Sequence, residues 1–150
     1  MILGSEFTEE QRFNQSWLYL ILVAVAVLPL LFKPKSEVGL FIHVMLVCLL
    51  FAFFLMMKLE TSIDKNGIRM RFFPFVKKEF QWSEIQKSKV VNYGFVGGWG
   101  IRLFTKYGTV YNIRGNKGLA IELKNGKKFL IGTQKEEEMK KFINGLRSKV

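Results

Sequence analysis

The fold of this chain is decided by one stretch in three parts: WLYLILVAVAVLPLLF (17–32), KPKSE (33–37) and VGLFIHVMLVCLLFAFFLMM (38–57). The first apolar run has sixteen residues and the second has twenty, interrupted only by His43. A helix needs roughly 20 apolar residues to cross a bilayer core, so the second run is long enough by itself. The first run reaches that length if residues 13–16 extend it into the interface, with Trp17 and Tyr19 as aromatic anchors.

The five-residue link predicts that the two helices are antiparallel neighbours, and Pro34 ends the first of them. Both ends of this helical hairpin then lie on one side of the membrane. The positive-inside rule favours the cytoplasm for that side, although the link is itself basic. The cations near that side are Arg12, Lys58, Lys65, Arg69 and Arg71. The sequence therefore predicts a multi-pass protein of the cell (plasma or inner) membrane with both termini cytoplasmic.

Three regions follow from this pattern. Residues 1–12 are expected to be a tail, residues 13–58 the two-helix transmembrane hairpin, and residues 59–150 a folded domain. Gly4-Ser5-Glu6-Phe7 also reads as the translation of two adjacent restriction sites, which leaves open whether residues 1–7 belong to the natural chain. The alternative, two core helices of a soluble protein, is disfavoured because so small a domain could not cover both runs.

Few polar groups lie inside the hairpin. Ala24 and Ala26 permit close helix approach, which favours packing within the hairpin or self-association. Apart from Tyr19 and Cys48, His43 is the one ionisable group of the apolar runs. Such a residue suggests function, but His43 lies near the link, and a hydrogen bond to the facing helix or to headgroup water is the simpler expectation.

The positive charge belongs to the C-terminal part. The whole chain has a net charge of +11, while residues 58–150 carry twenty Lys and Arg against eight Asp and Glu, a net charge of +12. Such a field attracts lipid headgroups, nucleic acid or acidic proteins. Residues 58–150 contain no Cys and no His, which excludes thiolate–imidazole zinc sites and Cys–His nucleophile pairs there.

From Leu59 onward the apolar period changes from helix to strand. Asn66-Gly67 and Asn125-Gly126 each predict a β-hairpin. Thr133 and Glu136 fit a capping box at the start of a C-terminal helix. About seven antiparallel strands are expected, in part at 89–93, 101–104, 110–114, 119–123 and 127–131. One apolar stripe follows along that helix, formed by Met139, Phe142, Ile143 and Leu146.

The predicted fold is α+β: a transmembrane hairpin, then a small antiparallel β-barrel or sandwich of the pleckstrin-homology-like (PH-like) type with one C-terminal capping helix. Four segments strengthen this reading: GGWGIR (97–102), YNIRGNKG (111–118), GKK (126–128) and IGTQ (131–134). With them the chain resembles a family of bacterial membrane proteins that have two N-terminal helices and a PH-like domain. The resemblance implies that fold and a membrane location, and it brings no catalytic residues.

Cations near the first β-hairpin are the candidate lipid or anion site. KNGIRMR (65–71) fits a loose lysine–arginine pattern that grips inositol phosphates, but its tight turn argues against a cup around a ligand. A solvated basic face and diffuse attraction to an anionic leaflet are the competing interpretations. The candidate residues are Lys65, Arg69, Arg71, Lys77 and Lys78.

Two aromatic segments are candidate partner contacts. In FFPFVKK (72–78), Phe72 and Phe75 are expected in the core and Phe73 on the surface. In YGFVGGWG (93–100), four glycines give the backbone access to positive φ, and Trp99 either packs or contacts a partner. Strands on both sides of this loop make a nucleotide-binding role improbable.

Enzymatic chemistry finds little support. The only aspartate is Asp64, in a turn, and the glutamates of the strands have no base nearby in sequence. No catalytic residue, metal site, cofactor or small-molecule substrate is predicted, and no recognisable nucleic-acid module appears. We expect a non-enzymatic adaptor that docks on membrane lipids or on another membrane protein. The alternative is an accessory subunit of a membrane enzyme or transporter whose chemistry lies in another chain.

Overall fold

The computed structural model describes residues 6–32 and 36–147. The chain divides into two compact units, one formed by Arg12–Met57 and the other by Met1–Gln11 together with Lys58–Val150. The fold is α+β, as expected, with three helices and two sheets.

The first unit contains α1 (Ser16–Leu31) and α2 (Glu37–Met56). Among the described residues, α2 is the one helix long and apolar enough to cross a membrane, and none of its residues is buried. Helix α1 is apolar but has only 16 residues. His43 Nε2 lies 3.1 Å from the carbonyl oxygen of Ala26, so the imidazole bonds to the facing helix, one of its two expected partners.

The first sheet of the second unit has four strands in the order β1-β2-β3-β4. They are β1 (Glu6–Arg12), β2 (Lys58–Asp64), β3 (Gly67–Phe73) and β4 (Val76–Gln81). The expected hairpin at Asn66-Gly67 is confirmed, since Ile63 pairs with Ile68 across it. Alternation puts Leu59, Ile63 and Phe72 in the core with 0% of each residue exposed.

The second sheet has five strands in the order β5-β8-β9-β7-β6. They are β5 (Ile85–Asn92), β6 (Gly100–Thr105), β7 (Gly108–Asn112), β8 (Lys117–Leu123) and β9 (Lys128–Gly132). Two expectations fail here. Strands β7 and β9 pair in parallel, so the sheet is not purely antiparallel, and the two sheets do not close into a barrel, because β4 and β5 each pair on one side only.

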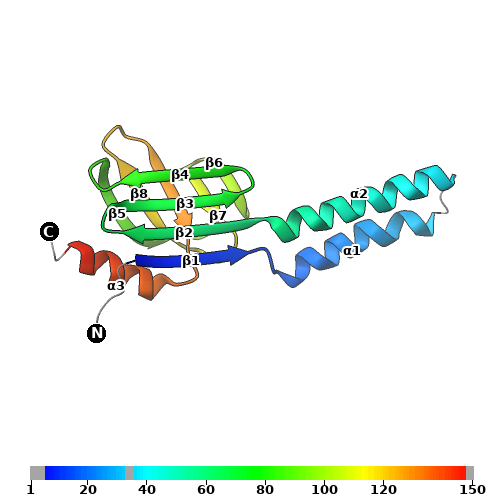
Figure 1. The fold of residues 1–150 in the computed structure, drawn as a ribbon, viewed down its shortest axis with the longest axis horizontal. Coiled ribbons are helices and arrows are strands. Elements are labelled where there is room, and N and C mark those ends of the chain that lie inside the picture. The colour runs from blue at the N-terminus through cyan, green and yellow to red at the C-terminus, as the bar shows by residue number, and fades with distance from the viewer. Residues whose placement is uncertain (1–5, 33–35, 148–150) are drawn as a thin grey trace. The chain divides into compact units, whose positions relative to one another are not determined.

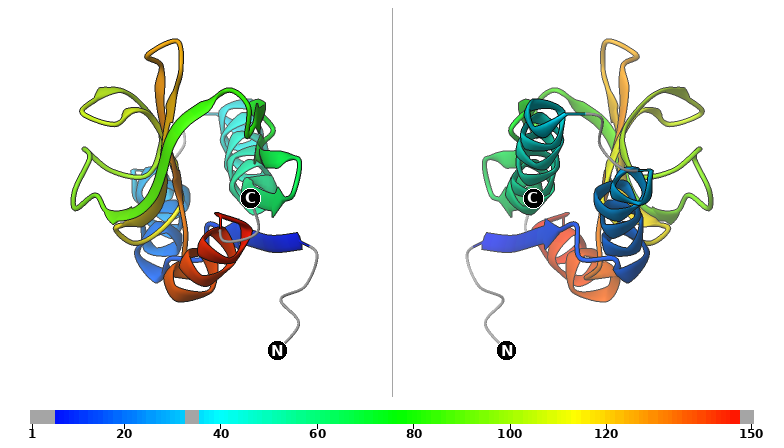
Figure 2. Two further views of the ribbon diagram at one scale, coloured as in Figure 1. Left: turned by 90° about the vertical axis from the view of Figure 1, so that its left-hand side faces the viewer. Right: turned by 90° about the vertical axis from the view of Figure 1, so that its right-hand side faces the viewer.

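The C-terminal helix α3 (Glu136–Arg147) joins the two sheets. Its stripe is buried as predicted at Met139, Phe142 and Ile143, while Leu146 is half-buried. The helix touches β5 and lies beside β1 (Figures 1 and 2). It therefore bridges an edge strand of each sheet, which keeps the edges from being open to solvent.

The predicted capping box forms only in part: Thr133 Oγ1 accepts a hydrogen bond from Lys135 N at 3.0 Å, but the reciprocal contact from Glu136 is not made. The helix begins at Glu136, and the carbonyl of Lys135 accepts the first helical bond, from Met139 N. The Glu136 carboxylate does not reach back, because it pairs with Lys140 Nζ at 2.7 Å and with Lys117 Nζ at 3.4 Å.

Strand β1 was not predicted at all, since residues 1–12 were expected to be a tail. It runs antiparallel beside β2 (Figure 1), although 45 residues of hairpin separate Arg12 from Lys58. The side chain of Phe7 is 3% exposed and its ring lies 6.3 Å from that of Phe142 in α3. The first strand is thus part of the domain core, and the helical hairpin is an insertion between two neighbouring strands.

A buried carboxylate fixes β1 to the start of α3. Glu9, which is 6% exposed, accepts a hydrogen bond from Thr133 Oγ1 at 2.5 Å and another from Gln134 N at 2.7 Å. Beside it, Gln11 Nε2 donates to the carbonyl of Gly132 at 2.7 Å. Hydrogen bonds to a charged group contribute about 1.5–3 kcal/mol each when buried, so β1 holds the C-terminal helix as well as the sheet edge.

Because β1 belongs to the core, we expect residues 58–150 alone to form a destabilised domain. A chain in which the dipeptide Asn-Gly replaces residues 13–57, and so links Arg12 to Lys58 through a tight turn, should fold as a soluble domain. The chain lacking residues 1–57 should be less stable by several kcal/mol, because loss of the buried Phe7 ring alone costs about 3–5 kcal/mol. Urea unfolding followed by circular dichroism measures the difference.

A matched pair of variants in the turn-joined chain tests the cause. Glu9→Ala should lower the free energy of unfolding by about 2–3 kcal/mol, since it leaves Thr133 and Gln134 N unpaired. Glu10→Ala, which removes an exposed carboxylate one residue away, should cost under about 1 kcal/mol. Equal stability of the two shortened chains, or of the two variants, contradicts the structural role of β1.

Candidate docking surface

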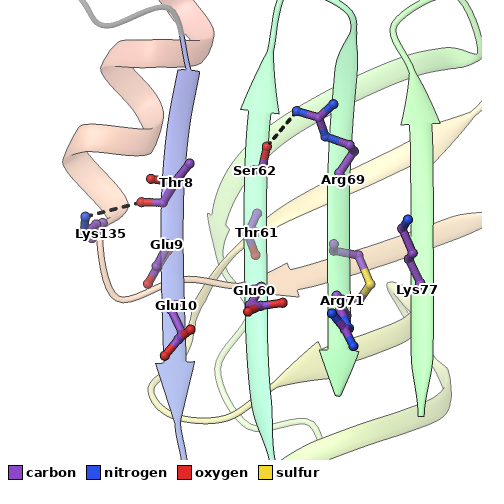
Figure 3. A pocket seen from close by; sticks show the side chains of 11 residues that line it. Thr8, Glu9, Glu10, Glu60, Thr61, Ser62, Arg69, Arg71, Lys77 and Lys135 are labelled. Atoms are coloured by element: carbon purple, nitrogen blue, oxygen red, sulfur yellow. Dashed lines mark hydrogen bonds between the residues drawn. The ribbon is translucent and has the colours of Figure 1, made fainter. Parts of the chain in front are cut away.

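The outer face of the four-stranded sheet carries a charged groove of about 540 Å³ (Figure 3). Side chains at alternate positions of the strands face away from the core, and the residues between them that also line the groove, Glu9, Thr61 and Met70, are buried. Lys135, from the segment before α3, closes one side by donating to the carbonyl of Thr8 at 3.4 Å. Its lining is Thr8, Glu9, Glu10, Glu60, Thr61, Ser62, Arg69, Met70, Arg71, Lys77 and Lys135.

Arg69 is neutralised by acids from two strands. Its Nη2 donates to Asp64 Oδ2 at 2.8 Å, to Glu6 Oε1 at 3.1 Å and to Ser62 Oγ at 3.2 Å. Burial tends to raise the pKa of Asp64, but hydrogen bonds from the following turn and the Arg69 charge bring it below its ordinary value. Arg69 is therefore a structural cation that ties β1, β2 and β3 together.

Lys58 is paired as well. It forms ion pairs with Glu60 and, at 3.2 Å, with Glu10 of β1. The hydrogen bonds to Glu60 and Glu10 raise the pKa of Lys58. The first residue after the helices is thus held by ion pairs to β1 and within its own strand, β2.

Arg71 and Lys77 are different, because neither forms an ion pair within 4 Å among the described residues, and Glu60, the direct partner of Arg71 on β2, is already paired with Lys58. Arg71 and Lys77 are direct partners across β3 and β4, and both are exposed. The Arg71 guanidinium lies over the Phe73 ring, 4.9 Å from its centroid. Like charges directly opposite each other destabilise a sheet, and an anion between them would relieve that repulsion. These two residues form the cationic pair of the surface.

The structure separates the five candidate cations that the sequence suggested. Arg71 and Lys77 are brought together, and Arg69 shares their face but is occupied by acids. Lys65 lies in the exposed β2–β3 turn. Lys78 points to the opposite side of β4, where its Nζ lies 5.6 Å from the ring centroid of Phe129.

The burial of the aromatic candidates also differs in part from the prediction. Phe72 is buried as expected, but Phe73 is half-buried beneath Arg71, and Phe75 is 54% exposed rather than in the core. The chain turns at Pro74, where Phe75 N donates to Phe72 O at 2.8 Å, so the strand alternation does not extend to Phe75. Trp99 is 39% exposed, in the loop between β5 and β6.

Sequence reasoning missed two acids of this surface and one exposed ring outside it. Glu6 and Glu10 come from β1, a strand that no local pattern indicated, and the exposed Phe95 lies in the glycine loop, where only Trp99 had been singled out. The alternation of EFTEEQR (6–12) was the available signal for β1.

Comparisons with protein-family models, with curated proteins and with solved structures gave no match to this chain. Within residues 6–32 and 36–147, no group of three or more His, Cys, Asp or Glu side chains could hold a metal ion.

The contrast between two arginines on one strand face gives a prediction. Arg69→Ala should lower the free energy of unfolding by about 1 kcal/mol, since it breaks a network of partly exposed ion pairs. Arg71→Ala should be close to neutral, because the repulsion from Lys77 and the attraction to Glu60, its two direct cross-strand partners, are lost together. Thermal unfolding of the full chain in a neutral detergent, at low and high salt, measures both. Equal losses in the two variants would mean that Arg71 is held as firmly as Arg69.

Proposed function

We propose that this protein is a membrane-anchored, non-enzymatic adaptor whose PH-like domain docks on the anionic surface of the bilayer that holds its helical hairpin. The observation that carries the proposal is the insertion of two apolar helices, of which α2 has no buried residue, between two neighbouring strands. Exposed apolar surface on this scale marks contact with lipid or with another protein. Helix α2, with 20 residues and none of them buried, has the length of a membrane span.

Two features support a hairpin that returns to its starting side. The chain leaves the sheet at the end of β1 and re-enters it at the start of β2, which are adjacent antiparallel strands (Figure 1). The bond between His43 and Ala26 joins the two helices. A 16-residue α1 spans roughly 24 Å at 1.5 Å per residue, so the proposal needs Trp17 and the flanking polar residues at the interface. The basic domain then lies on the cytoplasmic side.

The docking surface of the proposal is the pair Arg71 and Lys77. Cations near an anionic leaflet contribute about 1 kcal/mol each. Lys58, the first residue after Met57, pairs with Phe73 in the sheet, and Arg71 and Lys77 form a cross-strand pair two residues along β3. The cationic pair is thus tied by the chain itself to the point where the helix ends. A basic segment beside a membrane helix is a common arrangement for binding acidic lipids.

The resemblance to bacterial PH-like membrane proteins supports the adaptor reading. Two packed sheets with a C-terminal helix across their edges agree with that plan in outline. The structure departs from it in the open barrel and in the added first strand, and the role proposed here rests on charge and connectivity rather than on the family.

The turn-joined soluble chain tests the docking. It should float with liposomes that contain anionic lipid at low salt, and high salt should abolish the binding. The double variant Arg71→Gln/Lys77→Gln should lose about thirtyfold in affinity, at about 1 kcal/mol for each cation.

The control has the same change of net charge at another place. Lys124→Gln/Lys127→Gln alters two exposed lysines in and beside the β8–β9 turn and should retain most of the binding. A folded chain that ignores anionic liposomes, or equal losses in both double variants, overturns the proposal that this surface docks on lipid.

A further inference from the structure

Two exposed loops converge on the end of the domain from which the helical hairpin leaves. The first is the β3–β4 turn around Pro74. Its position follows from the register, because Phe73 is the direct partner of Lys58, which immediately follows the last helical cap residue, Met57. Phe75, in this turn, is 54% exposed.

The second loop, Gly94–Trp99, is tied to the same end by hydrogen bonds that start at β1. Gln11, one residue before the end of β1, bonds to the carbonyl of Gly132 at 2.7 Å. Gln134 Nε2 contacts Gln11 Oε1 at 3.4 Å and the carbonyl of Arg114 at 2.6 Å. The turn between β7 and β8 therefore lies at the hairpin end.

Further hydrogen bonds connect the β7–β8 turn to the glycine loop. Tyr93 OH, at the entrance of the loop, donates to the carbonyl of Gly115 at 3.0 Å. Asn112 Nδ2, at the end of β7, bonds to Tyr93 OH at 3.1 Å and to the carbonyl of Gly98 at 3.3 Å. Both aromatic loops are thus held by the scaffold at the end where β1 stops and β2 starts.

The rings on this second loop face outward. Phe95 is 83% exposed and Trp99 is 39% exposed. Gly94 and Gly97 have φ of 66° and 84°, a conformation that allows the loop to stand away from the core. A hollow of about 620 Å³ lies among these residues and Asn112. Aromatic rings in water are costly, whereas the bilayer interface is where such rings are enriched.

Cations surround these rings. Arg71 and Lys77 lie beside the first loop, and Arg114, exposed in the β7–β8 turn, lies beside the second. Aromatic groups flanked by Lys and Arg suit the boundary between acyl chains and anionic headgroups. An acidic protein surface would satisfy the cations but not the outward rings.

From this we infer that Phe75 and Phe95, with Trp99, insert into the interface of the same leaflet that the hairpin enters, and so form a second, non-covalent membrane contact that fixes the domain against the bilayer. This inference rests on the proposed membrane anchoring. It differs from electrostatic docking because an apolar insertion persists at high salt.

Single cysteines in the full chain, reconstituted in liposomes with anionic lipid, test it. Phe75→Cys and Phe95→Cys, each in a Cys48→Ser background, carry a polarity-sensitive fluorophore, and lipids brominated near the headgroup act as quenchers. The matched control is Phe104→Cys, because Phe104 is 100% exposed at the opposite end of β6, roughly 13 Å from Gly100 at about 3.3 Å per residue. The wild-type chain carries the same fluorophore at Cys48, inside α2. Quenching of that label by lipids brominated deeper in the acyl chain reports whether α2 lies in the bilayer.

The expected result is quenching of the labels at 75 and 95 that exceeds quenching at 104 several-fold and survives high salt. Having the two positions on different loops keeps the test decisive if one variant misfolds. If Cys48 is quenched but 75, 95 and 104 respond alike, the loop insertion is wrong while the anchoring stands. If Cys48 is not quenched, the membrane anchoring itself fails. Labels at 75 and 95 that are hidden from aqueous iodide yet unquenched by lipid would indicate a protein partner and would also overturn the inference.

Discussion

The pairing of β1 with β2 across the helical hairpin is the constraint on which the rest of the structure depends. It places Phe7 and Glu9 against α3, which in turn bridges the edges of both sheets. It also supplies Glu6 and Glu10, which neutralise Arg69 and Lys58. Because the hairpin is inserted between paired strands rather than appended to one, the domain is attached to it by two chain segments.

A double attachment has a structural consequence. A domain on one linker is attached at a single point, whereas here the chain leaves and re-enters the sheet at one end, where β1 stops and β2 starts. That end carries the cationic pair Arg71 and Lys77 and the exposed rings of Phe75 and Phe95. In the docking that we propose, charge would act over about a Debye length, roughly 8–10 Å, and the rings would act on contact, so the two kinds of group would have complementary roles.

Local patterns in the sequence predicted the local parts of the fold. The Asn-Gly turns, the alternation of β3 and β8, and the stripe Met139, Phe142 and Ile143 are signals within a few residues, and each is confirmed. Strand β1 was not predicted because its partner strand, β2, begins 46 residues after Arg12. No short-range pattern links the acidic segment 6–12 to a strand so far along the chain. The parallel pairing of β7 with β9 and the ion pair of Arg69 with Glu6 also join distant parts of the chain. The sequence therefore predicted which residues are candidates for the site, but not which of them lie together or are paired with acids.

The most direct measurement of the central claim is the sidedness of two cysteines in sealed vesicles. In a Cys48→Ser background, Ser36→Cys reports the cap of α2 at the hairpin tip, and Asn125→Cys reports the β8–β9 turn of the domain. With a membrane-impermeant maleimide, we expect the two sites to react from opposite sides of the membrane. Reaction of both from the same side would contradict a hairpin that crosses the bilayer.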